Sequence, residues 1–217
     1  MKIEHSSLNF RSINHPIKPF QLKTNNGKLL FTEIKFNKEI NPNLLKEIGS
    51  FFLDNFAAQS SHPFWKKCRK DHIEYDATTY QNYINGNLIE PIKNLIWNPD
   101  ATMLIGRKNK DKIAAAIVVD PLNIDESIKN DKTLYLDLIA VDKNYRKNNV
   151  GRNLIEKIFE TTKGRYEDCL LVAYNESVPF YKKLGFKNLP QNNNITENLA
   201  KHRIDYPEYA SFLIKKL

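Results

Sequence analysis

The chain has 217 residues. It contains 33 Lys and Arg residues and 25 Asp and Glu residues, which gives a formal net charge of +8. This length supports one well-filled core, and the charge suits an anionic cofactor or an acidic partner without identifying nucleic acid. Cys68 and Cys169 provide no disulfide framework or metal pattern, so we expect a reduced, cytoplasmic protein with no metal site. The first residues lack the apolar segment of a secretion signal, and the longest apolar run, Ile113–Val119, is too short to span a bilayer.

The N-terminal part of the chain predicts an arm, a strand and a helix. Residues 1–27 are polar and end in the turn signal Asn25-Asn26-Gly27, so they are expected to form an arm or an extra short element. Residues 28–36 alternate in a way that predicts a strand. Asn41-Pro42 predicts a helix start, because Pro favours the first helical position. The apolar stripe of this helix consists of Leu44, Leu45, Ile48, Phe51, Phe52 and Phe56.

Residues 59–99 are unusual in being both aromatic and basic. Phe64-Trp65 is followed by a run of Lys and Arg up to Lys70, and short helical patterns follow over 78–84 and 88–97. The Phe64-Trp65 pair predicts either a core anchor or one wall of a binding pocket. The charged run is correspondingly either the rim of that pocket or a solvated helix face.

The middle of the chain predicts strands. Residues 101–107 and 112–120 form a hairpin pattern, and the second of these is apolar enough to be a central strand buried on both faces. A loop is expected over 123–132. Residues 134–141 then alternate as a strand. One predicted face carries Leu134, Leu136, Leu138 and Ala140, and the other carries Tyr135, Asp137, Ile139 and Val141.

A basic loop and a helix follow this strand. The helix begins near Asn149, has an apolar stripe with a period near 3.6, and ends at Gly164. Its first turn offers unpaired N–H groups and a partly positive dipole, which suit a phosphate. Gly151 would let a phosphate approach the backbone, and the loop supplies Arg146, Lys147 and Arg152. The alternative is an ordinary solvated start of a basic helix.

Residues 144–152, Asn-Tyr-Arg-Lys-Asn-Asn-Val-Gly-Arg, resemble the acetyl-CoA loop of the GCN5-related N-acetyltransferase (GNAT) superfamily. The family pattern is Arg/Gln-x-x-Gly-x-Gly/Ala, and its marked positions are here Arg146, Asn149 and Gly151. Asn149 departs from the pattern by replacing the first Gly. Asn tolerates a positive φ better than most other residues, so the loop can keep its shape.

A second stretch, 170–186, is similar to the next strand and helix of the same family. The pattern there is roughly Asn-x-x-Ala/Ser-x-x-Phe/Leu-Tyr-x-x-x-Gly-Phe. The positions in step with it are Asn175, Pro179, Tyr181, Gly185 and Phe186, while Ser177 lies one place before the usual small residue. The two stretches together cover about the last half of the chain. Residues 188–207 are irregular, and an apolar strand over 208–216 is expected at the edge of the sheet.

The resemblance implies a fold of the α/β (α+β) class. After an arm at 1–27, residues 28–217 would form a single GNAT-like domain with a mixed, mostly antiparallel sheet of about six to seven strands flanked by helices. The sheet would splay between its fourth and fifth strands. The helical region between the first and second strands would be longer than usual.

The resemblance also implies an acetyl-CoA-dependent N-acetyltransferase, in which a primary amine attacks acetyl-CoA directly in a ternary complex. Tyr181 would be the general acid that protonates the CoA thiolate, and Asp137 the candidate base, acting through water. Asn175 would bind the pantetheine or cap a helix that starts at Glu176. The remaining residues expected to bind the cofactor, by backbone or side chain, are Ile139, Ala140, Val141, Arg146, Lys147, Asn148, Asn149, Val150, Gly151 and Arg152.

Two other functions are left open: a transferase that uses a longer acyl-CoA, and a catalytically silent acyl-CoA-binding module. The expected partner is an amine-bearing acceptor that the sequence does not identify, selected by residues 59–99. No membrane is expected as a partner, and nucleic acid is expected only as a tRNA-linked acceptor. Pairing of two copies as a homodimer is also left open.

Overall fold

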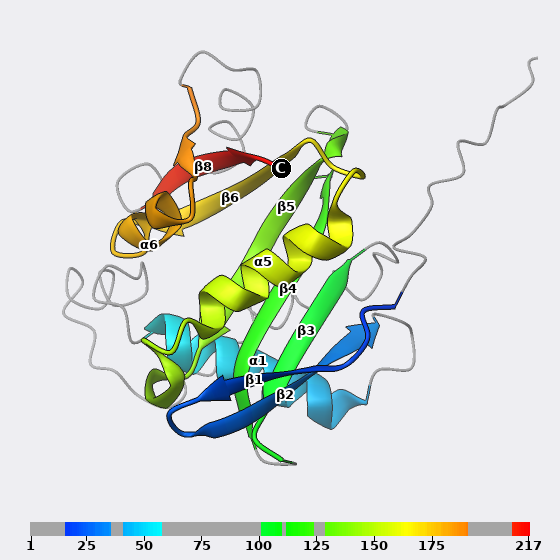
Figure 1. Ribbon diagram of the computed structural model, residues 1–217, viewed down its shortest axis with the longest axis vertical. Coiled ribbons are helices and arrows are strands. Elements are labelled where there is room, and N and C mark those ends of the chain that lie inside the picture. The colour runs from blue at the N-terminus through cyan, green and yellow to red at the C-terminus, as the bar shows by residue number, and fades with distance from the viewer. Residues whose placement is uncertain (1–15, 36–40, 58–100, 110–111, 124–128, 191–209) are drawn as a thin grey trace, which may run out of the picture.

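The computed structural model describes residues 16–35, 41–57, 101–109, 112–123, 129–190 and 210–217. They form one eight-stranded sheet in the order β1-β2-β3-β4-β5-β6-β8-β7 (Figure 1). Among these described strands, only β5 and β6 pair in parallel. The strands are β1 (Phe20–Thr24), β2 (Gly27–Lys35), β3 (Thr102–Arg107), β4 (Ile113–Asn123), β5 (Lys129–Val141), β6 (Asp168–Tyr174), β7 (Lys187–Asn188) and β8 (Ala210–Lys216).

The mixed, mostly antiparallel sheet confirms the predicted fold class, although it has eight strands where about six to seven were expected. One additional strand is β1, which lies within the predicted N-terminal arm and pairs with β2. The other is the two-residue β7, which pairs with β8. The last strand of the chain, β8, therefore lies between β6 and β7, and the prediction that it forms the sheet edge is wrong.

Helices cover both faces of the sheet. Among the described residues, the helices are α1 (Pro42–Ala57), α5 (Val150–Thr162) and α6 (Val178–Lys183), with a 3-10 turn at Lys143–Tyr145. Figure 1 shows α5 in front of the central strands and α1 behind them. The predicted stripe of α5 is buried against β4 and β5, whereas Ile48, Phe51 and Phe52 of α1 pack on the opposite face. No helix within the described ranges combines the length and hydropathy that a bilayer crossing requires.

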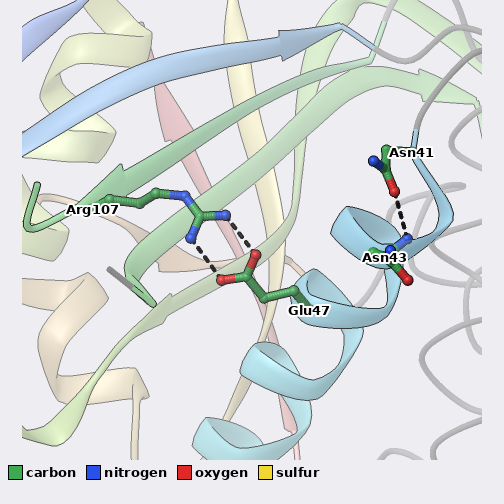
Figure 2. A network of polar contacts seen from close by, with 4 residues as sticks. All are labelled: Asn41, Asn43, Glu47 and Arg107. Carbon is green, nitrogen blue, oxygen red and sulfur yellow. Dashed lines mark hydrogen bonds and ion pairs between the residues drawn. The ribbon is translucent and has the colours of Figure 1, made fainter. Parts of the chain in front are cut away.

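The start of α1 is fixed by its own sequence and by the sheet (Figure 2). The side-chain oxygen of Asn41 accepts a hydrogen bond from the N–H of Asn43 at 2.8 Å, so Asn41 is the N-cap and Pro42 the first helical residue, as predicted. Glu47 accepts two hydrogen bonds from Arg107 of β3, at 2.7 and 2.6 Å. These bonds lower the pKa of Glu47 against the opposing effect of partial burial. The pair joins α1 to the sheet.

The centre of the sheet agrees with the sequence, and the β4–β5 turn does not. Every residue from Ile113 to Asp120 is buried, as expected for a strand covered on both faces. The predicted loop over 123–132 is shorter than expected, because Asn123 pairs with Lys129. Polar residues at the ends of β4 and β5 still have main-chain N–H and C=O groups, which continue the hydrogen bonding between the two strands. A prediction from hydrophobic alternation does not detect this pairing of polar residues.

A β-bulge interrupts β5 near its middle. Leu138 pairs with Val118 and Leu136 pairs with Val119, which leaves Asp137 as the extra residue between them. An extra residue reverses the faces of all residues that follow it. The predicted uninterrupted alternation of β5 is therefore wrong.

The packing around the bulge shows the reversal. Leu134 and Leu136 belong to the cluster under α5, and beyond the bulge Ile139 and Val141 pack against that same cluster. Leu138 and Ala140 pack with the cluster under α1 instead. Ile139 and Val141 therefore lie on the same face as Leu134, the α5 side. Unbroken alternation predicted them on the opposite face.

The sheet splays at the point where the sequence led us to expect it. The parallel pairing of β5 with β6 runs from Thr133 and Asp168 to Leu136 and Leu171. Both strands continue beyond that point, β5 to Val141 and β6 to Tyr174, where β6 pairs with β8. The end of β5 therefore has an edge that β6 does not cover.

Candidate active site

A cleft of about 550 Å³ lies at the uncovered end of β5. Its walls come from the end of β5, the following loop, the first turn of α5, the segment around α6, and one residue of α1. The lining residues are Asn55, Ile139, Ala140, Val141, Tyr145, Arg146, Lys147, Asn149, Val150, Gly151, Arg152, Glu176, Ser177, Phe180, Tyr181 and Lys183. Most of the residues predicted to bind the cofactor are thus brought to one cleft.

The edge of β5 presents main-chain groups to this cleft. The N–H of Asp142 donates to the carbonyl of Ala114 on β4 at 2.8 Å. Main-chain groups of successive residues point to alternate sides of a strand. Those of Ala140 therefore face β4, whereas those of Ile139 and Val141 face the cleft. An extended ligand beside β5 would meet the groups of these two residues.

The loop after β5 has two residues in the left-handed conformation, Lys147 with φ 63° and Asn149 with φ 57°. Asn149 is the N-cap of α5. The sequence led us to expect that Asn149 could replace a glycine by adopting a positive φ, and the structure shows that it does. Left-handed residues alternating with ordinary ones turn N–H groups toward one side, which favours anion binding.

Positive charge dominates the walls of the cleft. Arg146, Lys147, Arg152 and Lys183 line it, and Glu176 is its one carboxylate among the described residues. The first turn of α5 adds the positive end of a helix dipole. A Cβ atom added to Gly151 would lie 3.3 Å from Cζ of Phe180 across the cleft. A side chain at this position would meet the Phe180 ring and Val141, and the basic loop with the helix start has the features of a polyphosphate cradle.

Tyr181 lies in α6 with only 6% of its surface exposed. Its ring packs edge-on against Phe180 and Phe186, with centroid distances of 5.1 and 5.8 Å. Burial, with a smaller effect from Cys169, raises the pKa of the Tyr181 hydroxyl above its ordinary value. The hydroxyl is therefore protonated at neutral pH and can donate a proton to a group in the cleft.

Residues 99–188 match a family model described as an acetyltransferase (GNAT) domain. This segment contains β3 to β7, α5 and α6, and nearly all of the cleft. Over residues 99–188 the chain is therefore similar to a GNAT acetyltransferase domain. No curated protein sequence matches the chain.

Several solved structures share the fold of this chain. An acetyltransferase of the GNAT family from Staphylococcus aureus Mu50 is 18% identical with a TM-score of 0.54, and the match covers 86% of this chain and 99% of that one. The PaiA N-acetyltransferase of Thermoplasma acidophilum, solved in complex with coenzyme A, is 15% identical with a TM-score of 0.53 and coverages of 86% and 99%. A GNAT-family acetyltransferase from Listeria monocytogenes is 14% identical with a TM-score of 0.53, and its match covers 91% and 100%.

Some predicted site residues do not line the cleft. Asp137 is half-buried at the bulge. Asn148 turns its side chain away from the cleft: its Oδ1 accepts from Asn25, and its Nδ2 donates to the carbonyl of Arg146 at 3.1 Å. Asn175 lies in the turn between Tyr174 and Ser177, whose main-chain groups are hydrogen-bonded at 2.8 Å. Because α6 begins at Val178 with Ser177 as its N-cap, the predicted helix start at Glu176 is wrong.

Sequence reasoning also missed residues that line the cleft. They are Asn55, Tyr145, Glu176, Ser177, Phe180 and Lys183. Asn55 offered a signal that could have been used, since it follows Phe51 and Phe52 by one helical turn and is a polar residue on the buried face. Phe180 stands beside the predicted acid, in a position that the family pattern already marks as apolar. Phe64, Trp65 and the rest of 59–99 lie outside the described residues.

Proposed function

We propose that the protein transfers an acetyl group from acetyl-CoA to a primary amine by direct attack in a ternary complex. The observation that carries the proposal is the convergence of three features on one cleft. These are the free edge of β5, the basic loop at the start of α5, and the protonated, buried Tyr181. Each suits a different part of the acetyl-CoA molecule.

The shape and charge of the cleft support one orientation of acetyl-CoA. The pantetheine arm is extended and carries amides, so it pairs with the main-chain groups of Ile139 and with the N–H of Val141, which β6 leaves uncovered. The carbonyl of Val141 already accepts a hydrogen bond from Arg146. The pyrophosphate lies against the first turn of α5, near Gly151, Lys147 and Arg152. The thioester then lies deeper in the cleft, toward the sheet.

The chain's own residues perform the remaining tasks. The amine forms a C–N bond with the thioester carbon, and the C–S bond breaks. Tyr181 donates its proton to the departing thiolate and then regains a proton from solvent. Burial raises the pKa of Tyr181, which keeps the hydroxyl protonated until the thiolate forms. The proton lost by the amine passes through water to Asp137, which we retain as the proposed base although its carboxylate is not part of the cleft wall.

Two measurements test the proposal. Calorimetry should show binding of acetyl-CoA with a Kd in the low micromolar range or tighter, about −8 kcal/mol. A screen of amine acceptors should show release of free thiol with at least one amine, and a parallel screen with longer acyl-CoAs measures the preference for acyl length. Binding without thiol release for any amine would favour a silent acyl-CoA-binding module, and absence of binding at millimolar acetyl-CoA would overturn the proposal.

A further inference from the structure

Asn55 connects α1 to the loop that precedes α5. Its side chain is 7% exposed and lines the cleft. Its Nδ2 donates to the carbonyl of Phe51 at 2.9 Å, and its Oδ1 accepts from Nη2 of Arg146 at 3.1 Å. Nε of Arg146 in turn donates to the carbonyl of Val141 at 2.9 Å. A continuous chain of hydrogen bonds therefore runs from α1 through Arg146 to the end of β5.

This arrangement gives Arg146 a different task from the other cations of the cleft. Two of its guanidinium nitrogens are used within the protein, one on Val141 and one on Asn55. The planar guanidinium holds such fixed directions well. Arg146 caps the 3-10 turn at its C-terminal end, and Lys147 follows it directly in the left-handed conformation, so the backbone direction at Arg146 influences where the next N–H groups point. Arg146 thus acts as a brace of the loop.

We propose that Asn55 is a positioning residue for the cofactor, because it holds Arg146 and through it the conformation of residues 146–149. The proposal rests on the proposed function, since the cofactor it concerns is acetyl-CoA. Without Asn55 the Nη2 donor of Arg146 would lose its partner on α1, and the loop would have to be ordered when the ligand binds. The cost of that ordering weakens affinity for the diphosphate part of the ligand.

The alternative is that Asn55 stabilises only α1, through its bond to Phe51. Four variants of the full chain separate the two roles. Asn55→Leu removes both hydrogen bonds at similar volume, whereas Asn55→Asp keeps an oxygen acceptor for Arg146. Arg146→Met removes the brace itself. Thr162→Val is the matched control, because Thr162 is 2% exposed and donates to the carbonyl of Ile158 at 2.8 Å at the far end of α5.

The measurement is the Kd of each variant, by calorimetry, for CoA and for adenosine 3′-phosphate 5′-diphosphate, the part of CoA without pantetheine. Asn55→Leu should raise both values by about tenfold, as expected for a hydrogen bond to a charged group. Asn55→Asp should restore binding to within about threefold of the unmodified chain. Thr162→Val should lower the melting temperature without changing either Kd.

The Arg146→Met background gives the deciding comparison. If Asn55 acts through Arg146, adding Asn55→Leu to Arg146→Met should change the Kd by less than about twofold. Additive losses, or unchanged nucleotide binding in Asn55→Leu, would overturn the positioning role and leave the proposed function intact. Failure of the unmodified chain to bind CoA would overturn both.

Discussion

The N–H of Asn25 donates a hydrogen bond to Oδ1 of Asn148 at 2.9 Å, which joins the tip of the β1–β2 hairpin to the loop before α5. Nδ2 of Asn26 donates to the carbonyl of Asn144 in the same loop. The two contacts connect parts of the chain separated by 123 and 118 residues. Figure 1 shows the hairpin tip beside this loop. The β1–β2 hairpin therefore contacts the loop before α5 as well as extending the sheet.

Replacement of Asn148 by Ala should weaken acetyl-CoA binding without unfolding the protein. The change removes the bond to Asn25 and the bond that Asn148 donates to the carbonyl of Arg146. Such exposed bonds contribute about 0.5–1.5 kcal/mol, which corresponds to roughly a two- to tenfold rise in Kd. Asn188→Ala, in the exposed strand β7, is the matched control. Equal Kd values for both variants would show that the hairpin contact does not order the loop.

Substitution of Gly151 should separate stability from binding. Gly151 lies in α5, where Ala is favoured over Gly by up to about 1 kcal/mol, so Gly151→Ala should melt at an equal or higher temperature. Its Cβ would occupy the cleft wall facing Phe180, and acetyl-CoA affinity should fall several-fold. Gly151→Val should abolish binding at millimolar acetyl-CoA.

Phe180 provides the control for this prediction. The added Cβ would lie within 3.3 Å of the Phe180 ring, so a simple clash with that ring would be relieved by Phe180→Ala. If the methyl group instead excludes the phosphate, Gly151→Ala should remain weak in the Phe180→Ala background. Full recovery of binding in the double variant would show that the bare backbone is not the phosphate position.

The sequence predicted the parts of the site that depend on local chemistry. Asn149 adopts the positive φ that its replacement of a glycine suggested, because the requirement and the residue's tolerance are both local. The stripe of α5 and the cap of α1 follow from spacing and capping rules in the same way. Short-range rules therefore predicted the loop and the helix before any tertiary contact was known, whereas Tyr181 was proposed from the resemblance to the GNAT family.

Contacts between distant segments could not be predicted in this way. The bulge at Asp137 depends on the register that β5 takes against β4, and no residue in β5 marks it. The bonds of Asn55 to Arg146 and of Asn25 to Asn148 join segments that are 91 and 123 residues apart. Their partners are fixed only when the sheet and α1 assemble. The expectation that Asp137 shares the face of Ile139 relied on unbroken alternation, which the bulge interrupts, so the role of Asp137 as base stays a proposal.

Replacement of Tyr181 by Phe should lower turnover by roughly 10²–10⁴-fold with little change in acetyl-CoA affinity. Only the hydroxyl is lost, and the edge-on contacts with Phe180 and Phe186 are retained. The measurement is the split between kcat and the Kd for acetyl-CoA. Turnover equal to that of the unmodified chain would show that water or another group supplies the proton.

The pH profile gives an independent check on Tyr181. Burial raises its pKa, so the protonated, active form persists at pH values above the ordinary tyrosine pKa of about 10. Deprotonation of Tyr181 should therefore cause no loss of activity between pH 7 and about 10. An alkaline limb in this range that disappears in Tyr181→Phe would contradict the raised pKa.

The pair of Glu47 and Arg107 should make stability depend on acid pH. The Glu47 pKa is lowered in the folded protein, so the pair stabilises fully above the unfolded value of about 4.3, and this contribution is lost as pH falls through the folded pKa. Because the pair is partly exposed, with side chains 36% and 25% accessible, solvent screening limits the contribution to roughly 1 kcal/mol. Glu47→Gln should be less stable at pH 7 and less sensitive to acid, as measured by urea unfolding. Glu156→Gln, exposed on α5, is the control, and identical acid profiles for the two variants would rule out the effect.

The left-handed conformation of Asn149 can be tested by two opposite substitutions. Asn149 has φ 57° and ψ 13°, and its side chain makes no capping hydrogen bond. Asn149→Gly therefore removes no such bond and should leave both stability and acetyl-CoA affinity within a few tenths of a kcal/mol. Asn149→Val places a β-branched residue in a conformation that costs L-residues roughly 1–2 kcal/mol, so it should lower the free energy of unfolding by that amount.

The affinity change in Asn149→Val decides whether this conformation serves the ligand. If the left-handed residue directs N–H groups of the loop toward the pyrophosphate, Asn149→Val should also raise the Kd for acetyl-CoA by about tenfold, since the loop must be forced back into shape on binding. Asn153→Val is the matched control, because Asn153 lies one turn later in α5 and its N–H donates to the carbonyl of Asn149 at 2.9 Å with ordinary helical geometry. Lower stability with unchanged affinity in Asn149→Val would mean that the conformation supports only the start of α5. Loss of affinity in Asn149→Val alone, with Asn149→Gly and Asn153→Val close to the unmodified chain, would assign the loop shape to ligand binding.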